Sequence, residues 1–108
     1  WKNEIVYEHP DTHNPVQDFA IPRWEELLMI ATKCSELTGL GYLGVDMVLD
    51  RVKGPLLLEM NARPGLSIQI ANRCGLLRRL EYIHANGCLL GSAEDKVSFS
   101  RRYMSRIR

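Results

Sequence analysis

The chain has 108 residues, with 45% hydrophobic and 25% charged side chains, a composition typical of one small globular domain. Fourteen Lys and Arg against thirteen Asp and Glu give a net charge of +1, which neither favours nor excludes a nucleic-acid partner. No apolar run approaches membrane-spanning length, so we expect no membrane partner.

The N-terminal segment predicts a short strand, Glu4–Tyr7, followed by the loop sequence H-P-D-T-H-N-P. His9 and His13 are four residues apart, which is a metal-ligand spacing on a helix. Pro10 and Pro15 oppose a helix here, so we expect a solvated loop without a metal. The chain begins with Trp1 and not with Met, and we therefore expect it to be a piece of a longer protein.

Pro22 to Gly39 is the clearest predicted helix, because Pro favours a first turn and Gly favours a C-terminal cap. One stripe of the helix is expected to cover the apolar face of the next element. That stripe contains Trp24, Leu27, Leu28, Ala31, Ser35 and Thr38, with Cys34 at its edge. The opposite side carries Glu25, Thr32, Lys33 and Glu36.

Two apolar runs, Val45–Leu49 and Leu56–Met60, flank the turn-prone sequence D-R-V-K-G-P and predict a β-hairpin. Alternation along the strands predicts two faces. The apolar face, expected to be buried, contains Val45, Met47, Leu49, Leu56, Leu58 and Met60. The other face contains Gly44, Asp46, Val48, Leu57, Glu59 and Asn61.

Burial of the apolar face favours a register in which Asp46 lies opposite Glu59. The same register pairs Gly44 with Asn61 and Asp50 with Pro55, and it leaves the four-residue loop Arg51–Gly54. Two opposed carboxylates and a nearby amide oxygen suit a hard cation, Mg²⁺ or Mn²⁺. The alternative is that both acids are rim residues paired with nearby Arg or Lys.

Beyond Gly65 the sequence L-S-I-Q-I-A-N-R-C predicts a helix that ends at Gly75, and a second short helix is expected from Leu76 to His84. Residues 97–108 hold four arginines and are expected to form a basic tail after a domain of residues 1–96. Such a tail is more often a solvated end than a nucleic-acid site, so nucleic acid is not the expected partner.

The cysteines Cys34, Cys74 and Cys88 are an odd, widely spaced set without a C-x-x-C motif. They predict free thiols in a reducing compartment, and hence a cytoplasmic protein. A buried structural thiol is the default role for each.

An Asp on one strand, E-x-N at the end of the next and a following Pro-Gly turn resemble the metal-binding end of the ATP-grasp fold. The sequences G-Y-L-G-V-D-M-V-L-D and G-P-L-L-L-E-M-N-A-R-P-G-L-S-I-Q-I-A-N are similar to the α-L-glutamate ligase-like group. This group is related to ribosomal-protein S6 glutamate-ligase-type enzymes and to sugar-transfer-associated ATP-grasp proteins. The resemblance covers roughly His9 to Leu80.

The resemblance implies the C-terminal lobe of an ATP-grasp fold, an α+β structure whose small antiparallel sheet has helices on one face. It implies a carboxylate–amine ligase that uses ATP to form an acylphosphate and then an amide. Asp46, Glu59 and Asn61 are then metal ligands, and Arg63 acts on the phosphates as the catalytic residue. Val48 is placed where it could touch the adenine. The alternatives are simple packing for Val48 and an ion pair with Asp46 or Glu59 for Arg63.

The implied partners are ATP, a small-molecule or peptide carboxylate, an amine, and the N-terminal ATP-grasp lobe of the same protein. That lobe supplies the lysines and the glycine-rich loop that hold the nucleotide from the other side, so we expect the fragment alone to be inactive. An alternative of another class is a non-catalytic α+β module whose acidic face binds a divalent cation or a partner.

Overall fold

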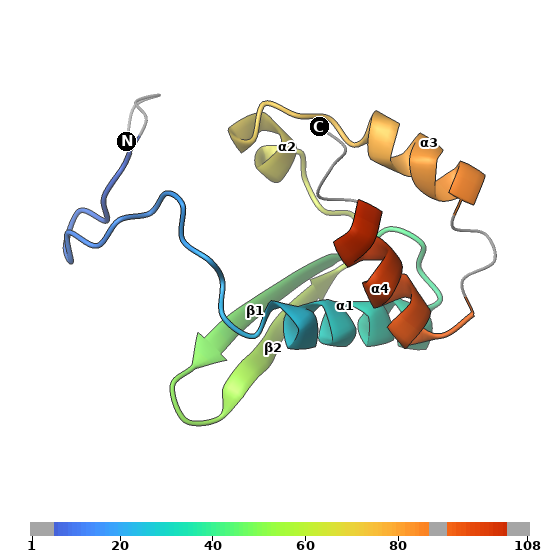
Figure 1. Ribbon diagram of the computed structural model, residues 1–108, viewed down its shortest axis with the longest axis horizontal. Coiled ribbons are helices and arrows are strands. Elements are labelled where there is room, and N and C mark those ends of the chain that lie inside the picture. Colours follow the sequence, from blue (N-terminus) through green and yellow to red (C-terminus); the bar gives the residue numbers. More distant parts are fainter. Residues whose placement is uncertain (1–5, 87–90, 104–108) are drawn as a thin grey trace.

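The computed structural model describes residues 6–86 and 91–103. In chain order the elements are α1 (Trp24–Thr38), β1 (Gly44–Asp50), β2 (Gly54–Asn61), α2 (Ser67–Ala71), α3 (Leu77–Asn86) and α4 (Ala93–Tyr103). The two strands form an antiparallel sheet, α1 and α4 lie together beside it, and α2 and α3 follow beyond the end of β2 (Figure 1). The expected α+β class with a small antiparallel sheet is confirmed.

Helix α1 begins at Trp24, two residues after Pro22, and ends at Thr38 as the capping signals predict. Arg23 occupies the N-cap position with a left-handed φ of 55°, and its carbonyl accepts the N–H groups of Glu26 and Leu27. Gly39 adopts a left-handed φ of 68° and donates its N–H to the Ser35 carbonyl at 2.9 Å. Glycine has no Cβ to oppose this conformation, which explains why the helix ends there.

Helix α4, which the sequence analysis did not predict, lies antiparallel to α1. Lys96 near its start binds Glu36 near the end of α1 at 2.7 Å, and Arg101 near its end binds Glu25 in the first turn of α1. Glu25 and Glu36 therefore face a neighbouring helix. The sequence analysis had placed both residues on the side of the helix opposite the stripe that was expected to pack. Helix α1 contacts both the hairpin and α4.

The small core lies in α1 and α4. Among the described residues, the buried hydrophobic side chains are Leu27, Cys34, Ala93 and Val97. Val97 is 3% exposed, whereas Trp24, expected in the packed stripe, is 50% exposed. Residues 97–103 of the expected basic tail are thus the second half of a packed helix. Arg106 and Arg108 lie outside the described residues.

The hairpin register is as predicted at one end and shifted by one residue at the other. Asp46 lies opposite Glu59 and Gly44 lies opposite Asn61, as expected. A bulge after Asp46 then adds one residue to β2, so the expected pairing of Asp50 with Pro55 is wrong and Asp50 pairs with Gly54. The loop is consequently Arg51–Lys53, one residue shorter than predicted.

Local hydrogen bonds explain the shorter loop. The Asp50 carboxylate accepts the N–H groups of Lys53 at 2.7 Å and Val52 at 2.9 Å, and Gly54 follows with a φ of 82°. A three-residue loop that closes with a left-handed glycine is a common hairpin connection. The backbone N–H groups of Lys53, which has the larger effect, and of Val52 hold the pKa of the Asp50 carboxyl below its usual value.

The expected buried apolar face of the hairpin does not form. Beyond the bulge, Leu57 faces Met47 and Leu56 faces Val48, which exchanges the faces predicted for Leu56 and Leu57. Leu58, the additional residue, is 65% exposed and Met60 is 46% exposed. Within the described chain, the hairpin therefore has apolar side chains exposed on both strands.

The start of α1 rests against the hairpin loop at Gly54. Gly54 is buried, and a Cβ built on it would lie 1.8 Å from a guanidinium nitrogen of Arg23. Arg23 also donates two hydrogen bonds to the Glu26 carboxylate, at 2.7 and 2.5 Å, which lower the pKa of Glu26. The Arg23 guanidinium therefore lies close to Gly54, where the start of α1 meets the hairpin.

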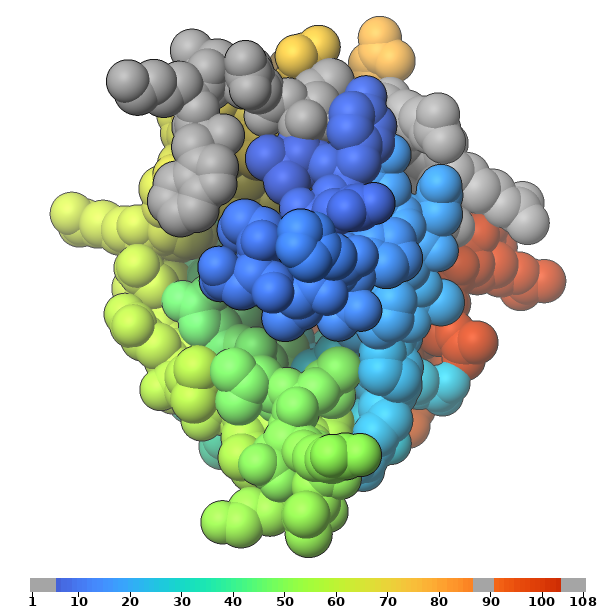
Figure 2. Space-filling model, turned by 90° about the vertical axis from the view of Figure 1, so that its left-hand side faces the viewer, coloured from blue at the N-terminus to red at the C-terminus, as the bar shows by residue number. Residues whose placement is uncertain are grey.

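The N-terminal segment extends away from the rest of the chain (Figure 1) and forms, with the hairpin, the face seen in Figure 2. An isolated bridge joins Glu8 and Pro15 across the loop. Val6 and Tyr7 are not in a strand, and the rest of the strand expected at Glu4–Tyr7 lies outside the described residues.

The chain exposes a large surface for its mass. Its accessible surface is 9259 Å², whereas a compact monomer of this mass exposes roughly 6,100 Å². The surface is thus about half as large again as expected for a closed domain of this size. Exposed apolar side chains of the hairpin and α2, including Leu58, Ile68 and Ile70, contribute to it.

Candidate metal and phosphate site at the hairpin end

Two carboxylates oppose each other near the end of the hairpin. Asp46 on β1 pairs directly with Glu59 on β2, and both residues are exposed. Directly opposed residues project from the same face of a sheet with Cβ atoms about 4.5–5.5 Å apart. Side-chain alternation and the cross-strand register together place these acids side by side.

Neither acid is neutralised by a basic group in the described part of the chain. The ion pairs there join His13 with Glu8, Arg23 with Glu26, Lys96 with Glu36 and Arg101 with Glu25. Among the described residues, Asp46 and Glu59 are therefore not paired with Arg or Lys, in contrast to the alternative interpretation of the sequence. Two adjacent unneutralised carboxylates are a fitting donor set for a hard cation.

Asn61 and Arg63 form a turn directly after Glu59. The Asn61 Oδ1 accepts the backbone N–H of Arg63 at 3.0 Å, and both residues are exposed. An amide oxygen retains a second lone pair after accepting one hydrogen bond, so it is still available to a cation. The bond also fixes where Arg63 leaves the strand. No ion pair joins Arg63 to Asp46 or Glu59 within the described residues.

The end of the hairpin is closely packed at Gly44. A Cβ built on Gly44 would lie 2.9 Å from the Cβ of Pro64 and 3.5 Å from that of Asn61. A side chain at this position would displace the turn, so glycine is needed for the close approach. The Asn61–Pro64 turn therefore folds back over the start of β1.

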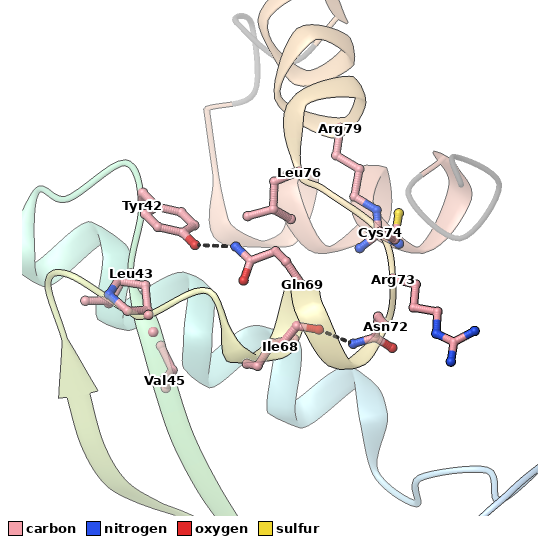
Figure 3. Close-up of a pocket in the computed structure, with 13 residues that line it drawn as sticks. Tyr42, Leu43, Val45, Ile68, Gln69, Asn72, Arg73, Cys74, Leu76 and Arg79 are labelled. Atoms are coloured by element: carbon pink, nitrogen blue, oxygen red, sulfur yellow. Dashed lines mark hydrogen bonds between the residues drawn. The ribbon is translucent and has the colours of Figure 1, made fainter. Parts of the chain in front are cut away.

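A groove that the sequence analysis missed begins at this point. It has a volume of about 750 Å³ and lies between the start of β1, α2 and the turn into α3 (Figure 3). Gly44 and Pro64 line it, and Gln69 on α2 donates a hydrogen bond to the Tyr42 hydroxyl at 3.1 Å. A second hollow of about 690 Å³ shares Tyr42 and Gln69 with it. No local sequence signal predicts contact between residues 27 positions apart.

Comparison with known proteins assigns the chain to a protein family. Residues 1–85 match the family described as sugar-transfer associated ATP-grasp. The chain belongs to this family. The predicted ATP-grasp relationship is therefore confirmed, and the exposed carboxylate pair lies within the matched part of this ATP-grasp chain.

A curated relative of this ATP-grasp chain is a cyanophycin synthetase from Crocosphaera subtropica, which is 29% identical over 89 residues. The match covers 73% of this chain and 10% of the relative, so the chain spans about one tenth of that protein. No solved structure matches the chain significantly.

Val48 and the N-terminal histidine loop of the ATP-grasp chain were also considered as site residues from the sequence. Val48 is 42% exposed and lies opposite Leu56, on the same side of β1 as Asp46. The His9 Nδ1 accepts the backbone N–H groups of Asp11 and Thr12, so this ring nitrogen closes the loop. In the described residues, no cluster of three or more His, Cys, Asp or Glu side chains is positioned to hold a metal.

The described cysteines are free thiols, Cys34 buried and Cys74 partly buried. Cys88 lies outside the described residues. No helix in the described ranges combines the length and the hydrophobicity needed to cross a bilayer.

Proposed function

We propose that this chain supplies the phosphate-binding face of an ATP-dependent carboxylate–amine ligase. The observation that carries the proposal is the direct opposition of Asp46 and Glu59 at the exposed end of the hairpin, in a chain of the ATP-grasp family. Asp46, Glu59 and Asn61 would hold Mg²⁺ or Mn²⁺. When bound, the metal supplies positive charge that offsets the charge of the ATP phosphates.

Arg63 and Val48 position the nucleotide in this proposal. The planar guanidinium of Arg63 offers paired donors to phosphate oxygens, and its backbone is fixed by the bond to Asn61. Val48 offers an apolar surface to the adenine one step along the strand from Asp46. Arg63 also stabilises the charge that develops as the γ-phosphoryl group leaves ADP.

The reaction has two steps. A carboxylate oxygen of the substrate attacks the γ-phosphorus of ATP, the bond to the bridging oxygen breaks, and ADP leaves. The amine nitrogen then attacks the carbonyl carbon of the acylphosphate, inorganic phosphate leaves, and the nitrogen loses a proton to give the amide. The chain has to position its substrates and neutralise charge, which the exposed hairpin end is suited to do. We propose a glutamate-ligase-like specificity on the resemblance of the hairpin sequence.

We further propose that another lobe of the same protein covers the hairpin and completes the nucleotide site. The chain spans one tenth of its curated relative, and its exposed surface is about half as large again as that of a closed monomer. The free thiols Cys34 and Cys74 support a reducing, cytoplasmic setting for the protein.

The test is ADP release by the full-length protein across a panel of carboxylates and amines, with Glu59→Gln as the site variant. Loss of a carboxylate that holds the metal is expected to reduce ADP release on the order of 100-fold or more. Glu94→Gln, an exposed acid in α4, is the matched control and should retain the parent rate. A Glu59→Gln protein as active as the parent would remove the proposed site.

Calorimetry separates the ligase from a non-catalytic metal-binding module. The ligase predicts that Mg²⁺ binds the full-length protein more tightly when ATP is present, because the phosphates provide part of the coordination shell. Metal affinity that is the same with and without ATP would contradict the ligase and favour the module.

A further inference from the structure

The hairpin has two outer edges that no other described strand covers. β1 and β2 pair with each other, and their sheet contains no third strand within residues 6–86 and 91–103. In an antiparallel pair, alternate residues direct their N–H and C=O groups to the partner strand, and the residues between them direct these groups outward. Each strand therefore presents a row of outward backbone groups. A two-stranded sheet is marginally stable in water, whereas a third strand gives a sheet that can be stable by itself.

The outer edge of β2 has two features that oppose pairing with another strand. Pro55 has no N–H to donate, and prolines in sheets are confined to edge strands, to strand starts and to bulges. The additional residue of the bulge, Leu58, interrupts the regular spacing of the backbone groups along the same strand. Proline and bulges are both means by which proteins prevent an edge strand from pairing. The sequence and geometry of β2 are thus those of an outer edge strand.

The outer edge of β1 lacks both features. β1 runs from Gly44 to Asp50 without a proline, and the additional residue of the bulge belongs to β2. The outward backbone groups of β1 are therefore regularly spaced along the whole strand. Acidic residues occur in both strands, Asp46 and Asp50 in β1 and Glu59 in β2, so charge does not distinguish the two edges. A regular, unprotected edge of this kind is a template for the addition of a further strand.

The side chains of β1 indicate which kind of strand fits beside it. Val45 and Met47 are partly buried, and alternation places Leu49 on the same face. Asp46 and Val48 lie on the other face. Apolar pairs across neighbouring strands are stabilising, whereas like charges directly opposite each other are destabilising. The fitting partner is an extended segment with apolar side chains at alternate positions and no acidic residue beside Asp46.

The same polypeptide is the best source of such a segment. The chain spans about one tenth of its curated relative, and its accessible surface of 9259 Å² is about half as large again as that of a closed monomer. A covalently linked segment can reach an effective concentration of roughly millimolar. A second copy of the chain would have to associate from solution at a much lower concentration.

We propose that the outer edge of β1 accepts an extended strand from another part of the full-length protein, while β2 remains an outer edge of the enlarged sheet. β1 is then an interior strand, and hydrogen bonds on both of its sides hold the backbone that carries Asp46. The inference rests on the proposed lobe that covers the hairpin, and it adds which edge is paired and by what kind of segment. It requires neither bound metal nor ATP.

Residue-resolved amide hydrogen exchange of the full-length protein, without metal or nucleotide, tests the proposal. In an interior strand every N–H is hydrogen-bonded, so the consecutive amides from Val45 to Leu49 should all exchange roughly 100-fold or more slowly than in an unfolded peptide. β2 is the matched internal control, because it lies in the same hairpin and has a similar length. Slow amides in β2 should be interspersed with fast ones, since an edge strand directs part of its N–H groups to water.

Three results would overturn the proposal. The first is alternation of slow and fast amides along β1, which would show that β1 is an edge strand. The second is slow exchange of all amides in β2, which would place the added strand at the other edge or show that the whole hairpin is covered without preference. The third is slow exchange in β1 that appears only at high protein concentration together with a dimer in light scattering, because a second copy would then supply the strand.

A parallel titration with Mg²⁺ and ATP separates failure of this proposal from failure of the ligase. If only the strand addition is wrong, ATP binding that depends on Glu59 persists. If only the ligase is wrong, the slow exchange of consecutive β1 amides persists.

Discussion

Asp46 and Glu59 lie directly opposite each other on neighbouring strands, immediately before the bulge at which the register of the hairpin changes. The bulge leaves this pair in the register set by Gly44 and Asn61, while every pair toward the loop is shifted by one residue. Bulges are frequent beside functional sites because they redirect side chains without interrupting the strand. The acidic pair and the exit turn thus form one locally ordered unit.

Gly44→Ala should disturb this unit without removing any of the proposed metal ligands. The added methyl group would lie 2.9 Å from the Pro64 Cβ, so the Asn61–Arg63 turn has to move. We expect Mg²⁺ affinity of the full-length protein to fall about ten-fold, as when groups that orient a ligand are lost. Gly41→Ala, where nothing lies within 4 Å of the added atom, is the control, and equal metal affinities of the two variants would refute the expectation.

Arg63→Lys tests whether the shape of the guanidinium matters. Lys retains the positive charge but loses the planar pair of donors. We expect kcat for ADP release to fall about ten-fold or more, with a smaller change in ATP affinity, because in the proposed reaction the donors act on charge that develops during transfer. Arg51→Lys in the exposed hairpin loop should leave both quantities unchanged. If kcat and ATP affinity of Arg63→Lys equalled those of the parent protein, the role of the residue would be purely electrostatic.

Gly54→Ala should loosen the hairpin from α1. The residue has a φ of 82° and its Cα faces the Arg23 guanidinium, so alanine is strained and also displaces that side chain. The left-handed conformation alone costs about 1–2 kcal/mol for a residue with a Cβ. Amide hydrogen exchange should accelerate in β1, β2 and the first turn of α1, and Gly41→Ala serves as the comparison. Unchanged exchange would show that the Arg23 contact does not fix the hairpin.

Val97→Ala tests whether α4 is an integral part of the fold. Val97 is 3% exposed, and its truncation is expected to cost about 2 kcal/mol through lost burial and the cavity left behind. The same substitution at Val52, which is 91% exposed, should change stability by no more than about 0.5 kcal/mol. Hydrogen exchange of the α1 amides measures the stability change in each of the two variants. Similar protection of α1 in the two variants would mean that α4 contributes little to the core.

Asp50 should make the hairpin loop sensitive to acid. Its carboxyl pKa is lowered in the folded chain by the N–H groups of Lys53 and Val52. The corresponding stabilisation is complete above the ordinary carboxyl pKa of about 4 and is lost as the pH falls through the lowered value. Loop amide exchange, corrected for its intrinsic pH dependence, should therefore rise below about pH 4. Asp50→Asn should abolish that pH-dependent part, and Asp18→Asn should not.

Local sequence patterns were sufficient for α1, for the hairpin and for the pairing of Asp46 with Glu59. Helix caps such as Gly39 and the alternation of strand residues act over a few positions, so they can be read directly from the chain. Helix α4 also has a local signal at its start, because the Ser92 Oγ accepts the backbone N–H of Asp95 and the Asp95 carboxylate accepts the backbone N–H of Ser92 in a capping arrangement.

The groove, the pairing of α4 with α1 and the bulge at Leu58 were decided only by tertiary structure. The Tyr42–Gln69 bond joins residues 27 positions apart, and the Lys96–Glu36 and Arg101–Glu25 pairs join residues 60 and 76 positions apart. Side-chain periodicity describes which face a residue occupies on its own element, but it carries no information about which distant element will cover that face. The sequence by itself therefore determined the residue types at the proposed metal site and their local register, while the spatial assembly of the elements created the groove.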